Sequence, residues 1–262
     1  MIKPNLDDMH NVITIAKQAG EKIMQIYQKD FSVESKEDQS PLTEADLASH
    51  HLICDELSKL YPDIPILSEE SAYTFTLKDE NTCFWCVDPL DGTKEFIKKN
   101  DEFTVNIALI QNQQPILGVI GVPAKNGVYA AVKGEGAFKQ QGGNELKKIH
   151  VKSQDPDHLT FAVSRSHLDD HTKAMVDKYE AEMLQAGSAL KLAFVAEGLV
   201  DVYPRFGPTM LWDVAAGQCI IEEAGGQVVR ADHHHPMTYN INRMKNESFI
   251  AMNKTLQKRL EA

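Results

Sequence analysis

The sequence of 262 residues has no apolar run close to the ~20 residues that a helix needs to cross a bilayer. Its first ten residues carry Asp7 and Asp8 where a secretory signal would have an apolar core. We therefore expect neither a membrane-spanning nor a secreted protein and place it in the cytoplasm. A peripheral position on the cytoplasmic face of the inner membrane is left open.

Basic residues are also scarce, because 27 Lys and Arg face 38 Asp and Glu and the formal net charge is −11. Proteins that bind long nucleic acids usually carry a basic face, so we expect no nucleic-acid polymer as a partner. An acidic protein can still bind a small anion if metal ions supply local positive charge.

Sulfur and imidazole ligands for a soft metal are few. Of the four cysteines, Cys83 and Cys86 form a C-x-x-C that runs into an apolar stretch, and no second pair accompanies it, so we interpret them as core residues. The run His233–His235 cannot turn all three rings toward one ion and is followed by Pro236, which is typical of a solvated loop.

Hydrophobic spacing predicts a layered α/β protein. Two amphipathic helices come first, with Thr43 and Asp46 at capping-box spacing at the start of the second. A meandering sheet is predicted next, and after Ser153 strands and helices alternate. We expect an N-terminal part, residues 1–152, and a C-terminal part, residues 153–262. The predicted segments are helices Leu6–Tyr27, Thr43–Leu60, Leu168–Tyr179, Ser188–Glu197 and Asp213–Ala224, a short helix from Lys254, and strands Phe84–Val87, Val105–Ile110, Ile116–Val122, Val128–Val132, Leu159–Ser164, Leu199–Tyr203 and Phe249–Met252.

The most informative segment is Asp88–Thr93, with the sequence DPLDGT. Asp88 follows a predicted buried strand, and active sites of α/β proteins form at such strand ends. Pro89 stiffens the turn, and Gly92 allows close approach of the backbone to a ligand. Asp88 and Asp91 can converge on one side of this turn, where their charges repel unless a proton or a cation lies between them.

Further carboxylates could complete a site for hard cations. Glu69 and Glu70 follow an apolar stretch, and Asp213 opens a predicted helix. Magnesium takes oxygen ligands, and two ions can stabilise the attacking and leaving oxygens of a phosphoryl displacement. Each residue alone has an ordinary alternative: Asp91-Gly92 is a common turn pair, Asp213 could be an N-cap, and Asp46 could serve only the capping box. Their co-occurrence favours the metal site.

These segments resemble the signature of the inositol monophosphatase superfamily, whose members are metal-dependent and lithium-sensitive. The matching segments are Ser40–Asp46 (SPLTEAD), Ser68–Glu70 (SEE), Asp88–Thr93 (DPLDGT), Trp212–Gly217 (WDVAAG) and Glu222–Gly226 (EEAGG). The resemblance covers nearly the whole chain. It implies the αβαβα sandwich of the inositol monophosphatase and fructose-1,6-bisphosphatase type.

The resemblance also implies roles for the matched positions. Magnesium, as two or three ions, would be held by Glu69, Asp88, the Leu90 carbonyl, Asp91 and Asp213, with Glu70 supporting a third, weaker ion. Asp46 and Thr93 would orient and deprotonate the attacking water, with Glu69 also counted among the catalytic residues. The backbone N–H groups of Gly92 and Thr93 would contact the phosphate. Inhibition by lithium, and by calcium, is implied as well.

Within the superfamily, the bacterial 3′(2′),5′-bisphosphate nucleotidases are most similar. Their features are present as Asp88–Phe96 (DPLDGTKEF), Phe103–Leu109 (FTVNIAL) and Tyr203–Thr209 (YPRFGPT). By this resemblance the nucleotide and its 5′-phosphate would be held by Ser164, His167, Ser188, Lys191 and Arg205. The metal-site residues Glu69, Leu90, Asp91, Gly92, Thr93 and Asp213 would contact the substrate too. Arg and Lys pair with phosphate, and Ser donates hydrogen bonds, so the residue types suit this role.

The expected reaction is therefore hydrolysis of 3′-phosphoadenosine 5′-phosphate to AMP and phosphate, and of its sulfated form, 3′-phosphoadenylyl sulfate, in the context of sulfate assimilation. Two alternatives remain. One is an inositol or sugar monophosphatase, which Phe206 disfavours because inositol phosphatases carry a Glu seven residues before the Trp-Asp aspartate. The other is a catalytically inactive binding protein, which the intact Asp46 and Thr93 disfavour. We expect a monomer and leave a dimer open.

Overall fold

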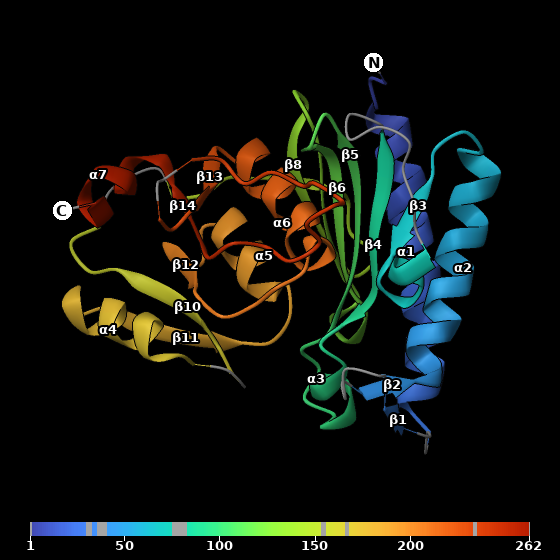
Figure 1. Cartoon of the computed structure of the whole chain (residues 1–262), viewed down its shortest axis with the longest axis horizontal. Coiled ribbons are helices and arrows are strands. Elements are labelled where there is room, and N and C mark those ends of the chain that lie inside the picture. Colours follow the sequence, from blue (N-terminus) through green and yellow to red (C-terminus); the bar gives the residue numbers. More distant parts are fainter. Residues whose placement is uncertain are drawn as a thin grey trace.

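The computed structural model describes residues 2–29, 33–35, 41–74, 83–152, 156–165, 168–232 and 235–261. Five layers follow one another across the molecule (Figure 1): two long helices, a large sheet, a helical middle layer, a smaller sheet and two short outer helices. This is the αβαβα arrangement that the sequence predicts. In the described ranges, none of the helices pairs sufficient length with the apolarity required to span a membrane.

The first layer consists of α1 (Leu6–Tyr27) and α2 (Glu44–Leu60). Asn5 caps α1, because its side chain accepts hydrogen bonds from the N–H groups of Asp7 and Asp8. Thr43 caps α2 through the predicted capping box, in which Asp46 accepts the Thr43 N–H at 2.8 Å. Both helices bury their apolar sides against the first sheet.

The large sheet has seven strands in the order β3-β4-β5-β6-β7-β8-β9. Apart from the parallel β3–β4 pair it is antiparallel, as a meander requires. Its strands are β3 (Ile66–Ser68), β4 (Phe84–Asp91), β5 (Thr104–Gln111), β6 (Gln114–Val122), β7 (Gly127–Val132), β8 (Gly136–Gln141) and β9 (Lys147–Ile149). A two-stranded ribbon of β1 (Val33–Ser35) and β2 (Pro41–Thr43) lies apart from it.

Two strands were predicted with wrong bounds: β12 runs over Val202–Arg205 instead of Leu199–Tyr203, and β4 ends later than expected. We expected Asp88 to follow a strand that stops at Val87, whereas β4 continues to Asp91. Its pairing with β5 shifts register between Asp88 and Asp91, which marks a bulge. The backbone therefore keeps pairing while the irregularity redirects the side chains, as bulges beside active sites commonly do.

The smaller sheet has five strands in the order β11-β10-β12-β14-β13. β10 lies between β11 and β12 with parallel pairing, whereas β14 pairs antiparallel with both of its neighbours. The strands are β10 (Thr160–Ser164), β11 (Glu182–Ala186), β12 (Val202–Arg205), β13 (Gly226–Arg230) and β14 (Phe249–Asn253). The outer helices are α4 (Asp170–Lys178) and α7 (Gln257–Glu261).

The middle layer, α5 (Leu190–Ala196) and α6 (Leu211–Glu223), packs against both sheets. Contact between α6 and β6 is close, since a Cβ at Gly118 would lie 2.5 Å from the Ala216 carbonyl oxygen. One apolar core consequently joins the two sheets. The predicted division at residues 152 and 153 falls between the last strand of the large sheet and the first strand of the smaller one, and the assignment of two parts stays a prediction.

Candidate active site

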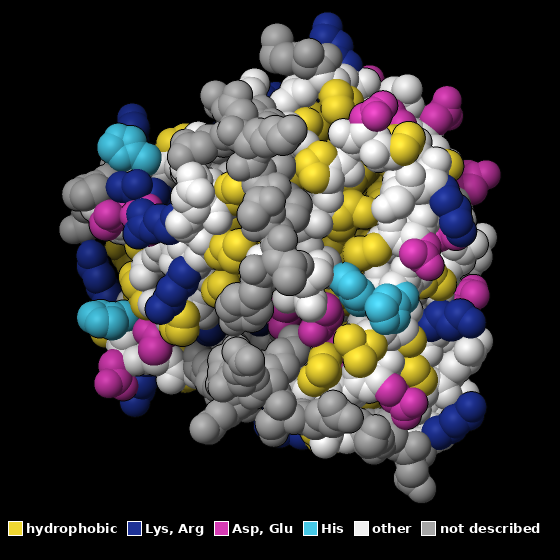
Figure 2. Space-filling model, turned by 45° about the vertical axis from the view of Figure 1, so that its right-hand side comes forward, with side chains coloured by type: hydrophobic (Ala, Val, Ile, Leu, Met, Phe, Trp, Pro, Cys, Tyr) yellow, Lys and Arg dark blue, Asp and Glu magenta, His cyan; other side chains and the backbone are white. Residues whose placement is uncertain are grey.

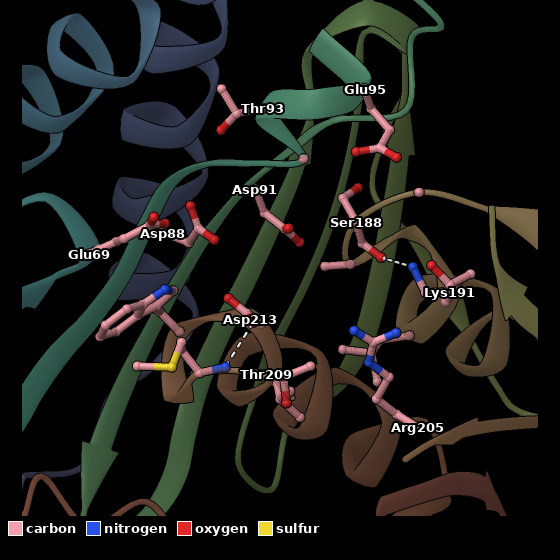
Figure 3. Close-up of a pocket in the computed structure, with 18 of the residues that line it drawn as sticks. Glu69, Asp88, Asp91, Thr93, Glu95, Ser188, Lys191, Arg205, Thr209 and Asp213 are labelled. Atoms are coloured by element: carbon pink, nitrogen blue, oxygen red, sulfur yellow. Dashed lines mark hydrogen bonds between the residues drawn. The ribbon is translucent and has the colours of Figure 1, made fainter. Parts of the chain in front are cut away.

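A cavity of about 400 Å³ lies where the end of β4 meets the first turns of α5 and α6. Its two sides differ in charge (Figure 3): Glu69 and Asp88 lie on one side, Lys191 and Arg205 on the other, and Asp91 and Asp213 between them. The predicted site residues that line it are Glu69, Asp88, Leu90, Asp91, Gly92, Thr93, Ser164, Ser188, Lys191, Arg205 and Asp213. Segments more than a hundred residues apart thus form one site.

The DPLDGT segment is fixed from three directions. Asp88 Oδ1 accepts the Leu90 N–H at 3.1 Å, and the Pro89 carbonyl accepts a hydrogen bond from Ser49 Oγ at 2.7 Å. Gly92 has φ = 92°, a left-handed conformation that glycine adopts without strain. The short helix α3 (Thr93–Ile97) begins directly after it. These contacts hold both carboxylates of the segment on the cavity wall.

Three aspartates of the cavity resist ionisation. Burial raises the pKa of Asp88 well above its usual value, and the negative charges of Glu69 and Asp91 raise it further. Burial also raises the pKa of Asp213 well above its usual value, and Asp91 adds to this effect. Burial raises the pKa of Asp91 to about 6, although the positive charge of Lys191 opposes the rise. The cluster therefore has more negative charge than its surroundings can neutralise.

Asp91 and Asp213 are held by neutral donors. Asp91 Oδ2 accepts hydrogen bonds from Asn106 Nδ2 at 3.3 Å and Thr104 Oγ1 at 3.5 Å. Asp213 Oδ2 accepts the Met210 N–H at 2.8 Å. Asp213 is thus not the N-cap of α6, which is Met210, but a first-turn residue that contacts the cap and faces the cavity.

This donor set suits a hard divalent cation, because it consists of carboxylate and carbonyl oxygens with an excess of negative charge. Among the described residues, no group of three or more His, Cys, Asp or Glu side chains is arranged so that it could already hold a metal ion. The assignment of Glu69, Asp88, Leu90, Asp91 and Asp213 as magnesium ligands therefore stays a prediction. Their position around one cavity and the raised pKa values of Asp88 and Asp213 support it.

Asp46 and Thr93 meet as the resemblance implies. Thr93 Oγ1 donates to Asp46 Oδ1 at 3.1 Å. The other carboxylate oxygen, Asp46 Oδ2, accepts from the N–H and the hydroxyl of Thr43 at 2.8 Å and 2.6 Å. Asp46 is only 1% exposed. The capping box and the contact to Thr93 are thus both present, because each uses a different oxygen of Asp46.

The cationic side of the cavity is built from α5 and β12. Lys191 is 4% exposed, and its Nζ donates to the carbonyls of Ser188 at 2.6 Å and Ala186 at 3.2 Å. Burial lowers its pKa to about 8, and Arg205 contributes in the same direction. Arg205 donates to the Pro208 carbonyl at 3.2 Å, and its buried Nε has no hydrogen-bond partner among the described residues. Both cations remain available to an anionic ligand.

The remaining site predictions have different outcomes. His167 lies outside the described residues. Phe206 does not line the main cavity. It lies on an adjoining hollow and packs its ring 5.6 Å from that of His171. Tyr203, which was not predicted as a site residue, lines the cavity, and its ring centre lies 5.3 Å from Lys191 Nζ. Its position two residues before Arg205 in the YPRFGPT segment was the available signal.

The cysteines and the run His233–His235 were interpreted as residues without a metal-binding role. All four cysteines are free thiols, with Cys86 buried in β4 and Cys83 partly buried just before it. His235 is exposed, and His233 and His234 lie outside the described residues. On the face shown in Figure 2, Lys and Arg side chains are mixed with Asp and Glu and form no continuous basic surface outside the grey atoms.

The model of the inositol monophosphatase family matches residues 5–261, so the chain belongs to this family. Among its relatives, the 3′(2′),5′-bisphosphate nucleotidase CysQ of Escherichia coli (strain K12) is 45% identical over 223 residues, which are 84% of this chain and 89% of the relative. The protein of the same name from Aggregatibacter actinomycetemcomitans is 37% identical over 249 residues, 94% and 90% of the two chains.

Solved structures agree with the fold. The crystal structure of CysQ from Bacteroides thetaiotaomicron has a TM-score of 0.82 and 39% identity, and the match covers 95% of this chain and 99% of that one. The Thermotoga maritima IMPase has a TM-score of 0.81 and 27% identity, with coverage of 97% and 95%. The predicted fold and family are confirmed.

Proposed function

We propose that the protein hydrolyses the 3′-phosphate of 3′-phosphoadenosine 5′-phosphate, releasing AMP and phosphate. The observation that carries this proposal is the two-sided cavity, with a carboxylate cluster on one side and Lys191 and Arg205 on the other. A nucleotide with two phosphates matches both sides. A substrate with a single phosphate, bound at the carboxylate side, would place no anionic group against Lys191 and Arg205. The CysQ relatives, named for this substrate class, support the same choice.

Magnesium suits the carboxylate side, where Glu69, Asp88, Asp91, Asp213 and the Leu90 carbonyl would hold it as two or three ions. When bound, magnesium supplies positive charge to the phosphate oxygens and lowers the pKa of a bound water. We extend the implied inhibition by lithium and calcium to this chain, since both would occupy the same oxygen ligands. The working unit is proposed to be a monomer.

Asp46 and Thr93 provide a route for the proton of the attacking water. Thr93 Oγ1 lies 3.1 Å from Asp46 Oδ1 and 3.4 Å from the Leu90 carbonyl oxygen, and Thr93 lines the cavity. When its hydrogen is donated to Asp46, the hydroxyl oxygen keeps a lone pair for a water. Thr93 can therefore accept a hydrogen bond from a water while its proton moves to Asp46. Because Thr43 fixes the second oxygen of Asp46, the carboxylate cannot rotate away.

The nucleotide end of the substrate is proposed to lie against Ser164, Ser188, Lys191 and Arg205, with His167 in the same set. Arg205 and Lys191 would pair with the 5′-phosphate. The buried Ser188 Oγ, which has no hydrogen-bond partner among the described residues, would gain one from the nucleotide. A 5′-phosphosulfate carries negative charge in the same place, so we propose 3′-phosphoadenylyl sulfate as a second substrate, within sulfate assimilation.

The test is phosphate release with magnesium, comparing 3′-phosphoadenosine 5′-phosphate, AMP and inositol 1-phosphate. We expect kcat/KM for the bisphosphate to exceed that for the other two by at least about 10²-fold, because a site built for a charged group rejects ligands that lack it. Equal rates on all three would contradict the proposal. Faster turnover of inositol 1-phosphate would identify an inositol phosphatase instead.

The role of Arg205 is tested by Arg205→Ala with 3′-AMP, which lacks the 5′-phosphate. We expect KM for the bisphosphate to rise about tenfold, since an ion pair to a phosphate is lost, and KM for 3′-AMP to change little. Arg243→Ala is the matched control, because Arg243 pairs with Glu247 on the surface and does not line the cavity. Equal effects of Arg205→Ala on both substrates would remove Arg205 from the 5′-phosphate side.

A further inference from the structure

Glu102 lies where the N-terminal and C-terminal parts of the chain meet, and none of the proposed roles in catalysis or binding involves it. It lies in the loop between α3 and β5, beside the DPLDGT turn. Arg165, which directly follows β10 in the C-terminal part of the chain, donates to both of its carboxylate oxygens, from Nε at 2.6 Å and from Nη2 at 2.7 Å. Glu102 Oε2 also accepts the Gly187 N–H at 2.9 Å. One side chain therefore ties two segments of the C-terminal part to the N-terminal part.

Gly187 begins the segment that carries the cationic side of the cavity. A Cβ at Gly187 would lie 2.7 Å from Glu95 Cγ and 2.8 Å from the Glu102 carbonyl oxygen, so only glycine allows this approach. The next residue, Ser188, has φ = 45°, in the left-handed region that a serine rarely adopts. Such a conformation is strained and persists only where neighbouring contacts enforce it.

The segment from Gly187 to Lys191, called the 187–191 segment below, contacts the carboxylate side directly. The Ala189 N–H lies near enough to the Asp91 carboxylate to lower the pKa of Asp91. A Cβ at Gly92 would lie 3.2 Å from both the Ser188 Cβ and the Glu102 carbonyl oxygen. The Ser188 carbonyl holds Lys191 Nζ. A small movement at Gly187 would therefore displace Ser188 and Lys191 together.

We infer that Glu102 is a positioning residue, which accepts the Gly187 N–H and thereby aligns Ser188 and Lys191 with the Asp91–Gly92 turn. The inference rests on the proposed function for the identity of the ligand that this alignment serves. Arg165 orients the Glu102 carboxylate, and its Nη2 also donates to the Gln185 carbonyl at 3.0 Å, so the end of β11 is held to the same group. Hydrogen bonds from Arg165 and Gly187 outweigh the effect of burial and lower the pKa of Glu102, so the carboxylate stays charged at neutral pH.

The alternative is an ion pair that only fastens the two parts of the chain to each other. Glu197 provides the matched control for this possibility. It accepts a hydrogen bond from Tyr129 and pairs with Lys139, so it also links the two parts of the chain. Its side chain is 15% exposed, against 14% for Glu102. It caps the other end of α5 and does not line the cavity.

The first measurement is amide hydrogen exchange of the 187–191 segment in the wild type, Glu102→Ala and Glu197→Ala, without substrate or metal. We expect exchange at Gly187 to become at least about tenfold faster in Glu102→Ala, because its acceptor is lost, and to stay unchanged in Glu197→Ala. Equal protection in all three proteins would overturn the inference. This measurement needs no turnover, so it decides the role of Glu102 even if the proposed substrate is wrong.

The second measurement is the kinetics with 3′-phosphoadenosine 5′-phosphate. Glu102→Ala should raise KM about tenfold and change kcat by less than about threefold, since ligand alignment is lost while Asp46 and Thr93 stay in place. Glu102→Gln, which keeps an acceptor for Gly187, should give a smaller rise and covers the case that the alanine variant fails to fold. A fall in kcat with unchanged KM would contradict the inference.

The double variant Glu102→Arg with Arg165→Glu separates the two explanations. It restores an ion pair between the same positions, but arginine cannot accept the Gly187 N–H. We expect KM and the exchange rate to stay as altered as in Glu102→Ala. Recovery of wild-type values would show that the ion pair alone suffices and would overturn the inference. If the wild type fails to cleave the bisphosphate, the proposed function fails while the exchange result still stands.

Discussion

Asp91 is both a source of charge repulsion within the carboxylate cluster and a proposed ligand of the catalytic magnesium. Burial raises its pKa to about 6, and its charge also raises the pKa values of Asp88 and Asp213. Asp91→Asn removes one of these charges and one proposed metal ligand. We expect turnover to fall by at least about 10³-fold, because the charge stabilisation that a metal ligand supports is lost. Phosphate release under saturating magnesium measures this.

The same variant should not unfold the protein. Without metal, Asp91→Asn should melt at or above the wild-type temperature, since a buried charge without a full counter-charge is destabilising. Magnesium should raise the melting temperature of the wild type by a few degrees and that of the variant by less, because binding stabilises only the folded state. Asp177→Asn, an exposed substitution on α4, is the control. Equal magnesium stabilisation of all three proteins would refute the role of Asp91 as a ligand.

Lys191 predicts a pH dependence. Its pKa is lowered to about 8 by burial and by Arg205, so the ammonium is charged below this pH and neutral above it. kcat/KM for the bisphosphate should therefore fall by up to about tenfold between pH 7 and pH 9 relative to kcat/KM for 3′-AMP, since it reports the free enzyme. In Lys191→Met the ratio should be lower and independent of pH. An unchanged pH profile in this variant would exclude Lys191 as the titrating group.

The residue scale also separates what the sequence could predict from what it could not. The carboxylates and Thr93 belong to short contiguous segments, so most of them could be predicted as site residues from the sequence. The structure places them in one cavity. Ser188 is different, because its left-handed backbone follows Gly187, whose N–H is bound by Glu102, a residue 85 positions away along the chain. No local spacing indicates such a contact.

At the scale of elements, the helices with strong caps and the buried strands were predicted well. Seven strands were not predicted, for two reasons. β1, β2 and β3 have only three residues each, and β8, β9 and β11 are largely polar, so none of the six shows a clear alternation of apolar residues. β13 starts at Gly226, and the pair Gly225-Gly226 was interpreted only as the end of a helix. Pairing with β14 supplies the order that the local sequence does not indicate.

The close packing of α6 on β6 leads to a prediction for Gly118. A Cβ there would lie 2.5 Å from the backbone oxygen of Ala216 and 2.9 Å from Cys219 Cβ, and neither atom can move without shifting α6. Gly118→Ala should lower the free energy of unfolding by about 2 kcal/mol and the melting temperature by about 5 °C. Thermal unfolding followed by circular dichroism measures the change.

Gly143→Ala is the control for this substitution. Gly143 is exposed in the loop after β8, and a Cβ there would have no neighbour within 4 Å. Its melting temperature should match that of the wild type. If the melting temperature of Gly118→Ala also equalled that of the wild type, α6 and β6 would not pack as closely as the structure indicates.

At the scale of the whole molecule, the helical middle layer makes the two sheets depend on each other. One core cluster includes Phe84 and Ile120 from the large sheet together with Tyr203 and Phe249 from the small one, with Ile220 of α6 between them. The proposed site lies at the same junction, since β4, α5 and α6 all contribute to it. Separation of the two parts would expose this core and dismantle the cavity.

We therefore expect the chain to unfold in a single cooperative step, and its two tryptophans allow a direct test. Trp85 is buried between the large sheet and the helices α1 and α2, whereas Trp212 is buried in the middle layer. In Trp85→Phe and Trp212→Phe, the fluorescence of the remaining tryptophan should follow the same urea transition as far-UV circular dichroism of that variant. Each comparison is made within one protein, so any loss of stability from the substitution cancels. A fluorescence midpoint that differs from the circular dichroism midpoint would show that residues 1–152 and 153–262 unfold as separate units.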